Sequence, residues 1–222
     1  MRFAVLRNLR NLRIKCSTVN LRHPLRIIAG KYRGRNLKSP SSLEVRPTSD
    51  RLRETLFNVI APRIEGARFL DLCAGSGAVG IEALSRGASH ATFVDRSRRM
   101  CSLIKANLDL CRVHIEQSEV VQAEAADYLR RVIARPRGGF HPWDIAFFDP
   151  PYAENYLLIL ETFGAHSSSL ISDNGALIVE HHHKNELQDE VGGIIRVRKL
   201  KQGDSTLSFY EIATSPRGTK CL

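Results

Sequence analysis

Two short runs of residues in this sequence combine side chains that could carry out chemistry. The first is Asp149-Pro150-Pro151-Tyr152, which follows the apolar run IAFF. The amine of a nucleobase is a poor nucleophile because its lone pair is delocalised, and two acceptors on the amine hydrogens favour localisation of that pair. The Asp149 carboxylate and the Pro150 carbonyl oxygen can accept these hydrogens, since prolines contribute no N–H donors, while Tyr152 can stack on the base. The run predicts catalysis of methyl transfer to such an amine; the alternative is a rigid turn with an incidental carboxylate.

The second run, Asp71 to Gly80, has the pattern of a cofactor-binding loop between a strand and a helix. Gly75 and Gly77 allow a ligand to approach the backbone, and ligands bind at the carboxyl ends of strands in such folds. With Gly80 they match G-x-G-x-x-G, and Asp95 lies 20 residues beyond Gly75, so the run alone also suits a dinucleotide. The Asp71 carboxylate would repel a pyrophosphate. It favours the ammonium and sulfonium of S-adenosylmethionine, whose ribose hydroxyls Asp95 can bind.

Strands and helices alternate from Phe69 onward, and this order predicts an α/β domain. The first three gaps between apolar runs are long enough for crossover helices, which indicates a mostly parallel sheet covered on both faces. Two later runs lie close together and predict a hairpin that closes the edge of the sheet. Glu124 and Ala125 follow the third run, where Glu124 is either a partner for an adenine amino group or an ordinary surface residue. The runs are RFLDL, ATFVD, EVVQA, DIAFFD and ALIVEH, followed by RVRKL and STLSFYEI.

An appendage of about 62 residues precedes this domain. Residues 25–38 predict a short hairpin with Gly30 and Gly34 in its turn, and residues 47–60 predict a helix whose start is marked by Pro47-Thr48-Ser49-Asp50. The expected boundaries are therefore an arm over 1–24, the appendage over 25–62, the main domain over 63–213 and a tail over 214–222.

Positive charge is concentrated at the N-terminus. Residues 1–55 contain 14 Lys and Arg against 3 Asp and Glu, whereas the remainder is nearly neutral. A concentrated basic block suits a polyanion because each neutralised phosphate releases counterions, and we expect Lys31, Arg33 and Arg35 on the hairpin to contact phosphates. The alternative is a solubilising tail. The acid-free arm over 1–24 is interpreted as a flexible RNA-binding segment or an early start codon, with an organelle transit peptide as the alternative.

The remaining composition predicts a soluble cytoplasmic protein. No apolar stretch approaches the roughly 20 residues that cross a bilayer. The number of cysteines is five, and none form a C-x-x-C pair. An odd number without such pairs favours reduced thiols in the cytosol over disulfides or a zinc site.

The two runs together resemble those of class I methyltransferases marked by an Asp/Asn-Pro-Pro-Tyr/Phe motif. The segments RIIAGKYRGRNLK, from Arg26, and RPTSDRLRETLFN, from Arg46, resemble more closely the bacterial family that methylates N2 of a guanine in small-subunit ribosomal RNA. This resemblance extends from about residue 25 to 212. It implies a Rossmann-like fold with a seven-stranded, mostly parallel sheet, an antiparallel last strand and helices on both faces. It also implies S-adenosylmethionine as cofactor, the 30S particle as partner and guanine 966 in the reference bacterial numbering as target.

The resemblance also implies roles for individual positions. It places the methionine end of the cofactor, its ribose and its adenine at successive strand ends, and the target base at the tetrapeptide. The cofactor-binding residues would be Asp71, Ala74, Gly75, Gly77, Asp95, Glu124, Ala125 and Asp149. The catalytic residues would be Asp149, Pro150, Pro151 and Tyr152. Arg46, Thr48, Asp50, Arg51 and Arg53 would shape the entrance near cofactor and RNA. Arg46, Thr48, Arg51 and Arg53 thus join Lys31, Arg33 and Arg35, which are expected from their charge, as the RNA-binding residues.

Some features depart from the family or are given no role in function. Glu124 stands where a shorter Asp or Asn is expected, and residues 1–24 have no counterpart in the family. His181, His182 and His183 are expected to be a solvated strand end rather than a metal site, because consecutive strand residues point to opposite faces. Cys73 and Trp143 are expected to be packing residues.

Three other functions stay open from the sequence. They are an adenine-N6 methyltransferase, an NAD(P)-dependent oxidoreductase and a non-catalytic ribosome assembly factor. The predicted methyltransferase is expected to be a monomer that binds no metal.

Overall fold

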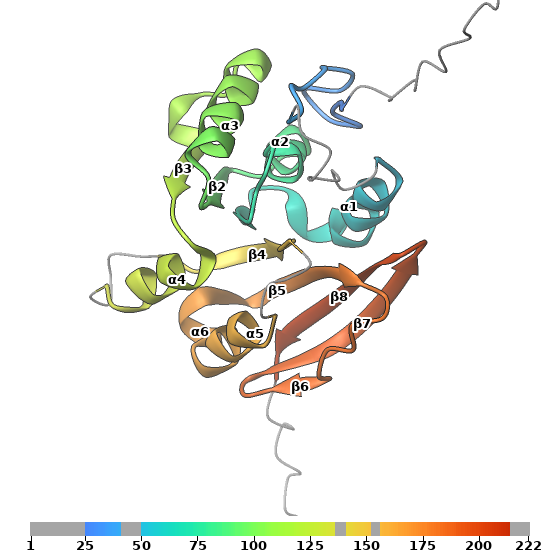
Figure 1. Ribbon diagram of the computed structural model, residues 1–222, viewed down its shortest axis with the longest axis vertical. Helices are drawn as coiled ribbons and strands as arrows, with labels where there is room; N and C mark the ends of the chain where they lie inside the picture. The colour runs from blue at the N-terminus through green and yellow to red at the C-terminus, as the bar shows by residue number, and fades with distance from the viewer. Residues whose placement is uncertain (1–24, 41–49, 136–140, 152–155, 214–222) are drawn as a thin grey trace, which may run out of the picture.

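A mixed sheet of eight strands forms the centre of the protein (Figure 1). The computed structural model describes residues 25–40, 50–135, 141–151 and 156–213. The strand order is β3-β2-β1-β4-β5-β8-β7-β6. The strands are β1 Arg68–Leu72, β2 His90–Asp95, β3 Ser118–Gln122, β4 Trp143–Phe148, β5 Ile171–His182, β6 Glu190–Val191, β7 Ile194–Gln202 and β8 Ser205–Ile212.

The direction of the strands confirms the predicted Rossmann-like architecture. Strands β1 to β5 pair in parallel, and the last strand, β8, is antiparallel to both β5 and β7. β8 lies inside the sheet between these two strands, so the outer part of the predicted hairpin, β7, forms the edge together with β6. The sheet has one strand more than the seven expected, because the two residues of β6 pair with β7.

Two layers of helices cover the sheet (Figure 1). Successive strand residues point to opposite faces, as Phe69 and Leu70 show by packing into different core clusters. Helices α1, α2 and α3 contribute to the first cluster and α4, α5 and α6 to the second. Their bounds are α1 Asp50–Ile64, α2 Ala78–Ser85, α3 Arg98–Cys111, α4 Ala125–Ile133, α5 Tyr156–Ala165 and α6 Ser167–Leu170, with a 3-10 turn at Ile115–Gln117.

The N-terminal appendage follows its prediction in outline. The expected hairpin is a turn closed by an isolated bridge between Arg26 and Asn36, without extended strands. The expected helix is α1, which begins at Asp50 in the described part of the chain and continues through Pro62 to Ile64. The first three residues of the predicted helix, 47–49, lie outside the described residues.

A buried ion pair holds the appendage against the main domain. Glu82 of α2 is fully buried and accepts hydrogen bonds from the backbone N–H groups of Ile28, at 2.8 Å, and Ala29, at 3.0 Å. Arg53 of α1 is also fully buried, with its Nε 4.0 Å from a Glu82 oxygen. Arg53 donates to the Asp50 carboxylate and to the Arg26 carbonyl oxygen. One acid and one base thus connect the turn, α1 and α2.

The turn of the appendage lies at the amino edge of the sheet. The backbone N–H of Lys31 donates to the carbonyl oxygen of Ser85, the last residue of α2, at 2.7 Å. This end of α2 is next to the start of β1, because Gly66 N donates to Gly87 O at 2.8 Å. Lys38, at the far side of the turn, reaches the opposite edge, where Asn107 bonds both to Lys38 and to the carbonyl oxygen of Ser76. The appendage therefore lies along α2, a distance of about 12 Å for eight residues.

Glu82→Gln should destabilise the protein strongly. The substitution keeps the shape of the side chain but removes the buried anion that Arg53 shares with Arg86, leaving Arg53 only the partly exposed Asp50. Breaking a buried pair in this way costs about 3–5 kcal/mol. Urea unfolding followed by fluorescence measures the loss, with the exposed Glu54→Gln on α1 as the control. A loss below about 1 kcal/mol, typical of an exposed pair, would contradict the role given to Glu82.

Candidate functional site

The two runs singled out in the sequence emerge side by side at one point of the sheet. β1 pairs with β4, and their last residues, Leu72 and Phe148, are register partners. Just beyond them, the backbone N–H of Asp149 donates to Leu72 O at 3.4 Å. The chain leaves β1 toward β2 on one side, while β4 lies on the other, and such a switch in strand order opens the crevice where α/β sheets bind ligands.

Asp71 is a buried carboxylate beneath the glycine loop. Its side chain is 2% exposed and accepts a hydrogen bond from the backbone N–H of Gly80 at 2.9 Å. Burial raises the pKa of Asp71 to about 7, opposed by the bond from Gly80 and helped by the charge of Asp95. A carboxyl group in this state is half ionised near neutral pH, and a cationic ligand would favour its charged form.

The glycine loop has the backbone conformation that its glycines allow. Gly75 and Gly77 have φ of 54° and 76°, in the left-handed region, and Cys73 shares it with φ of 62°. Gly80 serves packing instead, because a Cβ there would lie 2.3 Å from the ring of Phe93. The third glycine of the G-x-G-x-x-G pattern therefore reflects close contact between α2 and β2 rather than a ligand.

Asp95 connects the glycine loop to the end of β2. One carboxylate oxygen accepts from the backbone N–H of Gly75 at 2.9 Å, and the other accepts from Ser97 N at 2.8 Å. Each oxygen of a carboxylate has two lone pairs, so Asp95 can also accept from two neighbouring hydroxyl groups. Asp95 thus retains the acceptor capacity that the predicted contact with a ribose requires.

The proposed adenine position lies at the end of β3. Ala125 is the buried first residue of α4, whereas Glu124, directly before it, is exposed and lies 3.7 Å from Arg96. The Glu124 carboxylate therefore lies near a cation at the surface and is not enclosed in a pocket. A role for it with adenine stays a prediction.

The tetrapeptide is described up to its third residue. Asp149 is half-buried, Pro150 is buried and Pro151 is exposed, so the motif passes from core to surface within three residues. The predicted stacking residue, Tyr152, lies outside the described residues. The Asp149 side chain thus belongs to the carboxyl edge of the sheet, next to the glycine loop.

The structure separates the residues expected to face RNA. Lys31, Arg33 and Arg51 are exposed. Arg35 is half-buried, with its guanidinium over the ring of Tyr32 and a 3.1 Å bond to the carbonyl oxygen of Leu110. Arg46 and Thr48 lie outside the described residues.

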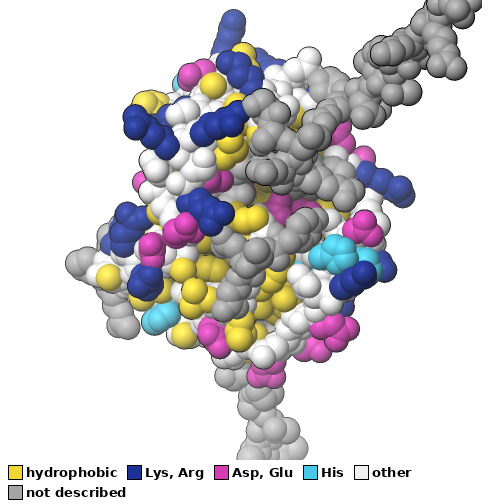
Figure 2. Space-filling view, in the orientation of Figure 1, with side chains coloured by type: hydrophobic (Ala, Val, Ile, Leu, Met, Phe, Trp, Pro, Cys, Tyr) yellow, Lys and Arg dark blue, Asp and Glu magenta, His cyan; other side chains and the backbone are white. Residues whose placement is uncertain are grey.

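The expectation that Arg53 faces RNA is wrong for this conformation. Its side chain has no exposed surface, and its nearest charged partners are Asp50 and Glu82. A signal was present in the sequence, because Arg53 lies at helical spacing from Leu56, Phe57 and Ile60 on the buried face of α1. Figure 2 adds that Lys and Arg side chains also gather over α3, beyond the basic N-terminal block.

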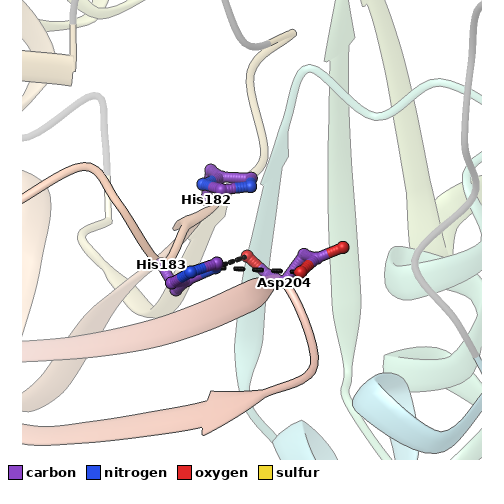
Figure 3. A group of neighbouring side chains, drawn as sticks. All are labelled: His182, His183 and Asp204. Atoms are coloured by element: carbon purple, nitrogen blue, oxygen red, sulfur yellow. Dashed lines mark hydrogen bonds and ion pairs between the residues drawn. The ribbon is translucent and has the colours of Figure 1, made fainter.

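The histidine triplet divides into one buried and two partly exposed residues. His181 is 2% exposed, which corrects the expectation that all three are solvated. His182 and His183 stack with ring centroids 4.5 Å apart and planes at 29°, and His183 lies beside Asp204 from the turn between β7 and β8 (Figure 3).

A metal ion would need a different arrangement of these side chains. Ring nitrogens, one each from His182 and His183, lie within 4.8 Å of one another and of an Asp204 oxygen. However, the lone pairs of imidazole nitrogens lie in the ring plane, and nearly parallel stacked rings do not direct them to one point. His182 Nδ1 also accepts from the backbone N–H of Lys184 at 3.1 Å. We assign no metal to these three residues.

Two buried polar residues next to the site were not predicted from the sequence. Glu82 stands within the otherwise apolar helix AVGIEALS, and such an isolated charge was a usable signal. Asn107 is also fully buried, and its amide donates to Ser76 O in the glycine loop at 2.9 Å. Asn107 lies at helical spacing from Ile104 and Cys111 on the apolar face of α3, so its position was a second usable signal.

The region that matches a known protein family includes both the site and the appendage. The family model described as "Conserved hypothetical protein 95" matches residues 25–211. Ribosomal RNA small subunit methyltransferase D of Escherichia coli K12 is 41% identical over 156 residues, or 70% of this chain and 71% of that protein. The Haemophilus influenzae protein of the same name is 40% identical over 141 residues, or 64% and 70%. The structure of a hypothetical protein from Thermus thermophilus has a TM-score of 0.70 and 30% identity, and the match covers 84% of this chain and 99% of that one.

The raised pKa of Asp71 predicts that S-adenosylhomocysteine binding weakens in acid. An ammonium ligand favours the carboxylate, so binding releases a proton from the protein, and affinity should fall about tenfold for each pH unit below 7. Calorimetric titrations between pH 5.5 and 8 measure this dependence. Asp71→Asn should remove it, whereas the exposed Asp173→Asn should retain it. A dissociation constant that is constant over this range in the wild-type protein would exclude the ionic role of Asp71.

Proposed function

The chain belongs to the conserved hypothetical protein 95 family, and on this basis we propose that it is an S-adenosylmethionine-dependent ribosomal RNA methyltransferase. Its relatives named ribosomal RNA small subunit methyltransferase D support the reaction class and the kind of RNA. The observation that carries the proposal is the position of Asp149, adjacent to the glycine loop at the crevice between β1 and β4. A methyl donor in that loop and an acceptor for a base amine would meet there.

The cofactor would occupy the carboxyl edge from β1 to β3. Asp71, Ala74, Gly75 and Gly77 would hold its methionine part, Asp95 its ribose, and Glu124 with Ala125 its adenine. Bound S-adenosylmethionine would supply an electrophilic methyl group. The half-ionised Asp71 supports this cofactor over a dinucleotide, since a buried carboxylate beside the loop disfavours a pyrophosphate.

The target would be the N2 amine of a guanine, placed against the tetrapeptide. The Asp149 carboxylate and the Pro150 carbonyl oxygen would accept the two amine hydrogens as the nitrogen becomes tetrahedral, and Tyr152 would stack on the base. Because the acceptors act on charge that develops during the reaction, they lower the barrier more than they strengthen ground-state binding. An adenine-N6 amine has the same chemistry and is the second candidate.

The substrate would be the small ribosomal subunit, in keeping with the names of these relatives, and the target position would be guanine 966. A monomer working in the cytoplasm, with no metal, fits this proposal. Among the described helices, none is both long and apolar enough to span a bilayer. Mapping of methylated nucleosides in 16S RNA from cells with and without the gene tests the position. If loss of the gene removes an N2-methylguanosine at another position, that position is the target instead.

Asp149→Ala should nearly abolish methyl transfer while leaving the affinity for S-adenosylhomocysteine within about tenfold. The loss should exceed the roughly 1–3 kcal/mol of one ground-state hydrogen bond to a charged group, because the acceptor acts mainly in the transition state. Single-turnover transfer of labelled methyl groups to unmethylated 30S particles measures it. The exposed Asp173→Ala is the matched control. Normal turnover of folded Asp149→Ala protein would exclude Asp149 from catalysis.

Lys31 and Arg33 are proposed to contact RNA phosphates, together with Arg51. The double variant Lys31→Gln, Arg33→Gln should weaken 30S binding and flatten its salt dependence, with a log–log slope smaller by roughly 0.7–0.9 for each phosphate that is no longer neutralised. Binding measured over a range of salt tests this, and Arg130→Gln, Arg131→Gln on α4 removes the same charge elsewhere. The methylated nucleotide should not change, since phosphate contacts carry no sequence information. A slope equal to that of the wild type in the turn variant would mean that the turn does not face RNA.

A further inference from the structure

Three aromatic rings close the base of the loop that carries the tetrapeptide. Phe148 is the last residue of β4, and Tyr156 is the first residue of α5. Their ring centroids are 6.2 Å apart with planes at 74°, and the same values describe the contact between Tyr156 and His181. The two described ends of the connection from β4 to α5 therefore meet, and one of them packs on His181.

His181 is held in one orientation by both of its ring nitrogens. Nδ1 lies 3.0 Å from the carbonyl oxygen of His182, and Nε2 lies 2.9 Å from the hydroxyl of Ser208, which is fully buried on β8. A carbonyl oxygen can only accept, so Nδ1 carries the proton and Nε2 accepts from the serine. This tautomer is the neutral imidazole.

The surroundings of His181 keep the ring neutral. Burial lowers its pKa, and the charges of Lys199 and Arg196 on β7 lower it further, while the bond to the His182 carbonyl opposes the change. A charged ring could no longer accept from Ser208 Oγ. The orientation seen here thus belongs to the state that is populated at neutral pH.

His181 also lies beside the tetrapeptide in the register of the sheet. Phe148 of β4 pairs with Val179 of β5, two residues before His181. Neighbouring strands are about 4.8 Å apart, so the exit of the chain from β4 through Asp149 and Pro150 runs next to His181. His181 is therefore placed where it can influence the direction in which the chain leaves β4.

We propose that His181 is a positioning residue for methyl transfer, which through Tyr156 and Phe148 fixes the direction of the Asp149 and Pro150 acceptors. This inference rests on the proposed function, because it assigns His181 to the reaction of Asp149. Acceptors that must reach both hydrogens of one amine tolerate little displacement, and an error of about 1 Å can reduce a rate by about a hundredfold. His181 touches neither cofactor nor base in this role.

Two substitutions distinguish the effect of the hydrogen bonds that orient His181 from the effect of its ring volume. His181→Phe retains an aromatic ring against Tyr156 but loses both hydrogen bonds that orient it. His181→Gln loses the ring but offers an acceptor to Ser208 and a donor to the His182 carbonyl. His183→Gln, in the partly exposed part of the same triplet, is the matched control.

The experiment measures kcat with unmethylated 30S particles, the dissociation constant of S-adenosylhomocysteine and the thermal unfolding midpoint of each full-length variant. We expect His181→Phe to lose about tenfold or more in kcat with cofactor affinity within about twofold, and His181→Gln to recover to within about threefold of wild type. His183→Gln should match the wild type in all three measurements.

The possible outcomes distinguish this inference from the function on which it rests. Wild-type kcat in folded His181→Phe overturns the inference alone, as does an equal loss of kcat and cofactor affinity in both His181 variants, which would mark a general structural role. If the wild-type protein binds S-adenosylhomocysteine but methylates no 30S particle, the proposed function is wrong and the inference falls with it.

Discussion

The pairing of β1 with β4 is the constraint on which the rest of this site depends. The two strands are far apart in the sequence, yet their last residues, Leu72 and Phe148, share a register. The chain must leave them in different directions, so a crevice opens where their carboxyl ends meet. The glycine loop and the tetrapeptide each occupy one side of it. A shift of one residue in this register would reverse the faces of one strand and separate the two motifs.

A second constraint, the buried pair of Arg53 and Glu82, determines how the appendage lies on this sheet. Glu82 belongs to α2, the helix whose first turn supplies the Gly80 N–H to Asp71. The same helix therefore supports the cofactor loop at one end and the appendage along its length. Asn107 adds a direct connection, since its side chain bonds both to Lys38 and to the glycine loop at Ser76. The position of the appendage and the shape of the loop are consequently coupled through buried polar groups.

The sequence predicted those parts of the structure that depend on local patterns. Short apolar runs located β1 to β5, and the spacing of Gly75 and Gly77 located the loop, because each depends on neighbouring residues alone. The distant partners that accompany the buried Arg53 and His181 could not be predicted in this way. Arg53 is buried because Glu82, from a different helix, compensates its charge, and His181 is buried because β8 returns beside β5 with Ser208. Such pairs are fixed by the packing of distant elements.

The manner in which the appendage is attached explains how it can carry so much positive charge. The side chains that hold its turn, Glu82, Ser85 and Asn107, bond to the backbone of residues 28–38. The Ser85 hydroxyl makes two such bonds, because it accepts from Tyr32 N and donates to Ala29 O. Because these contacts involve the backbone, the side chains of Lys31 and Arg33 are left exposed. The fold of the turn is therefore largely independent of its charge, so exposed cations can be arranged there for a polyanionic partner at little cost to stability.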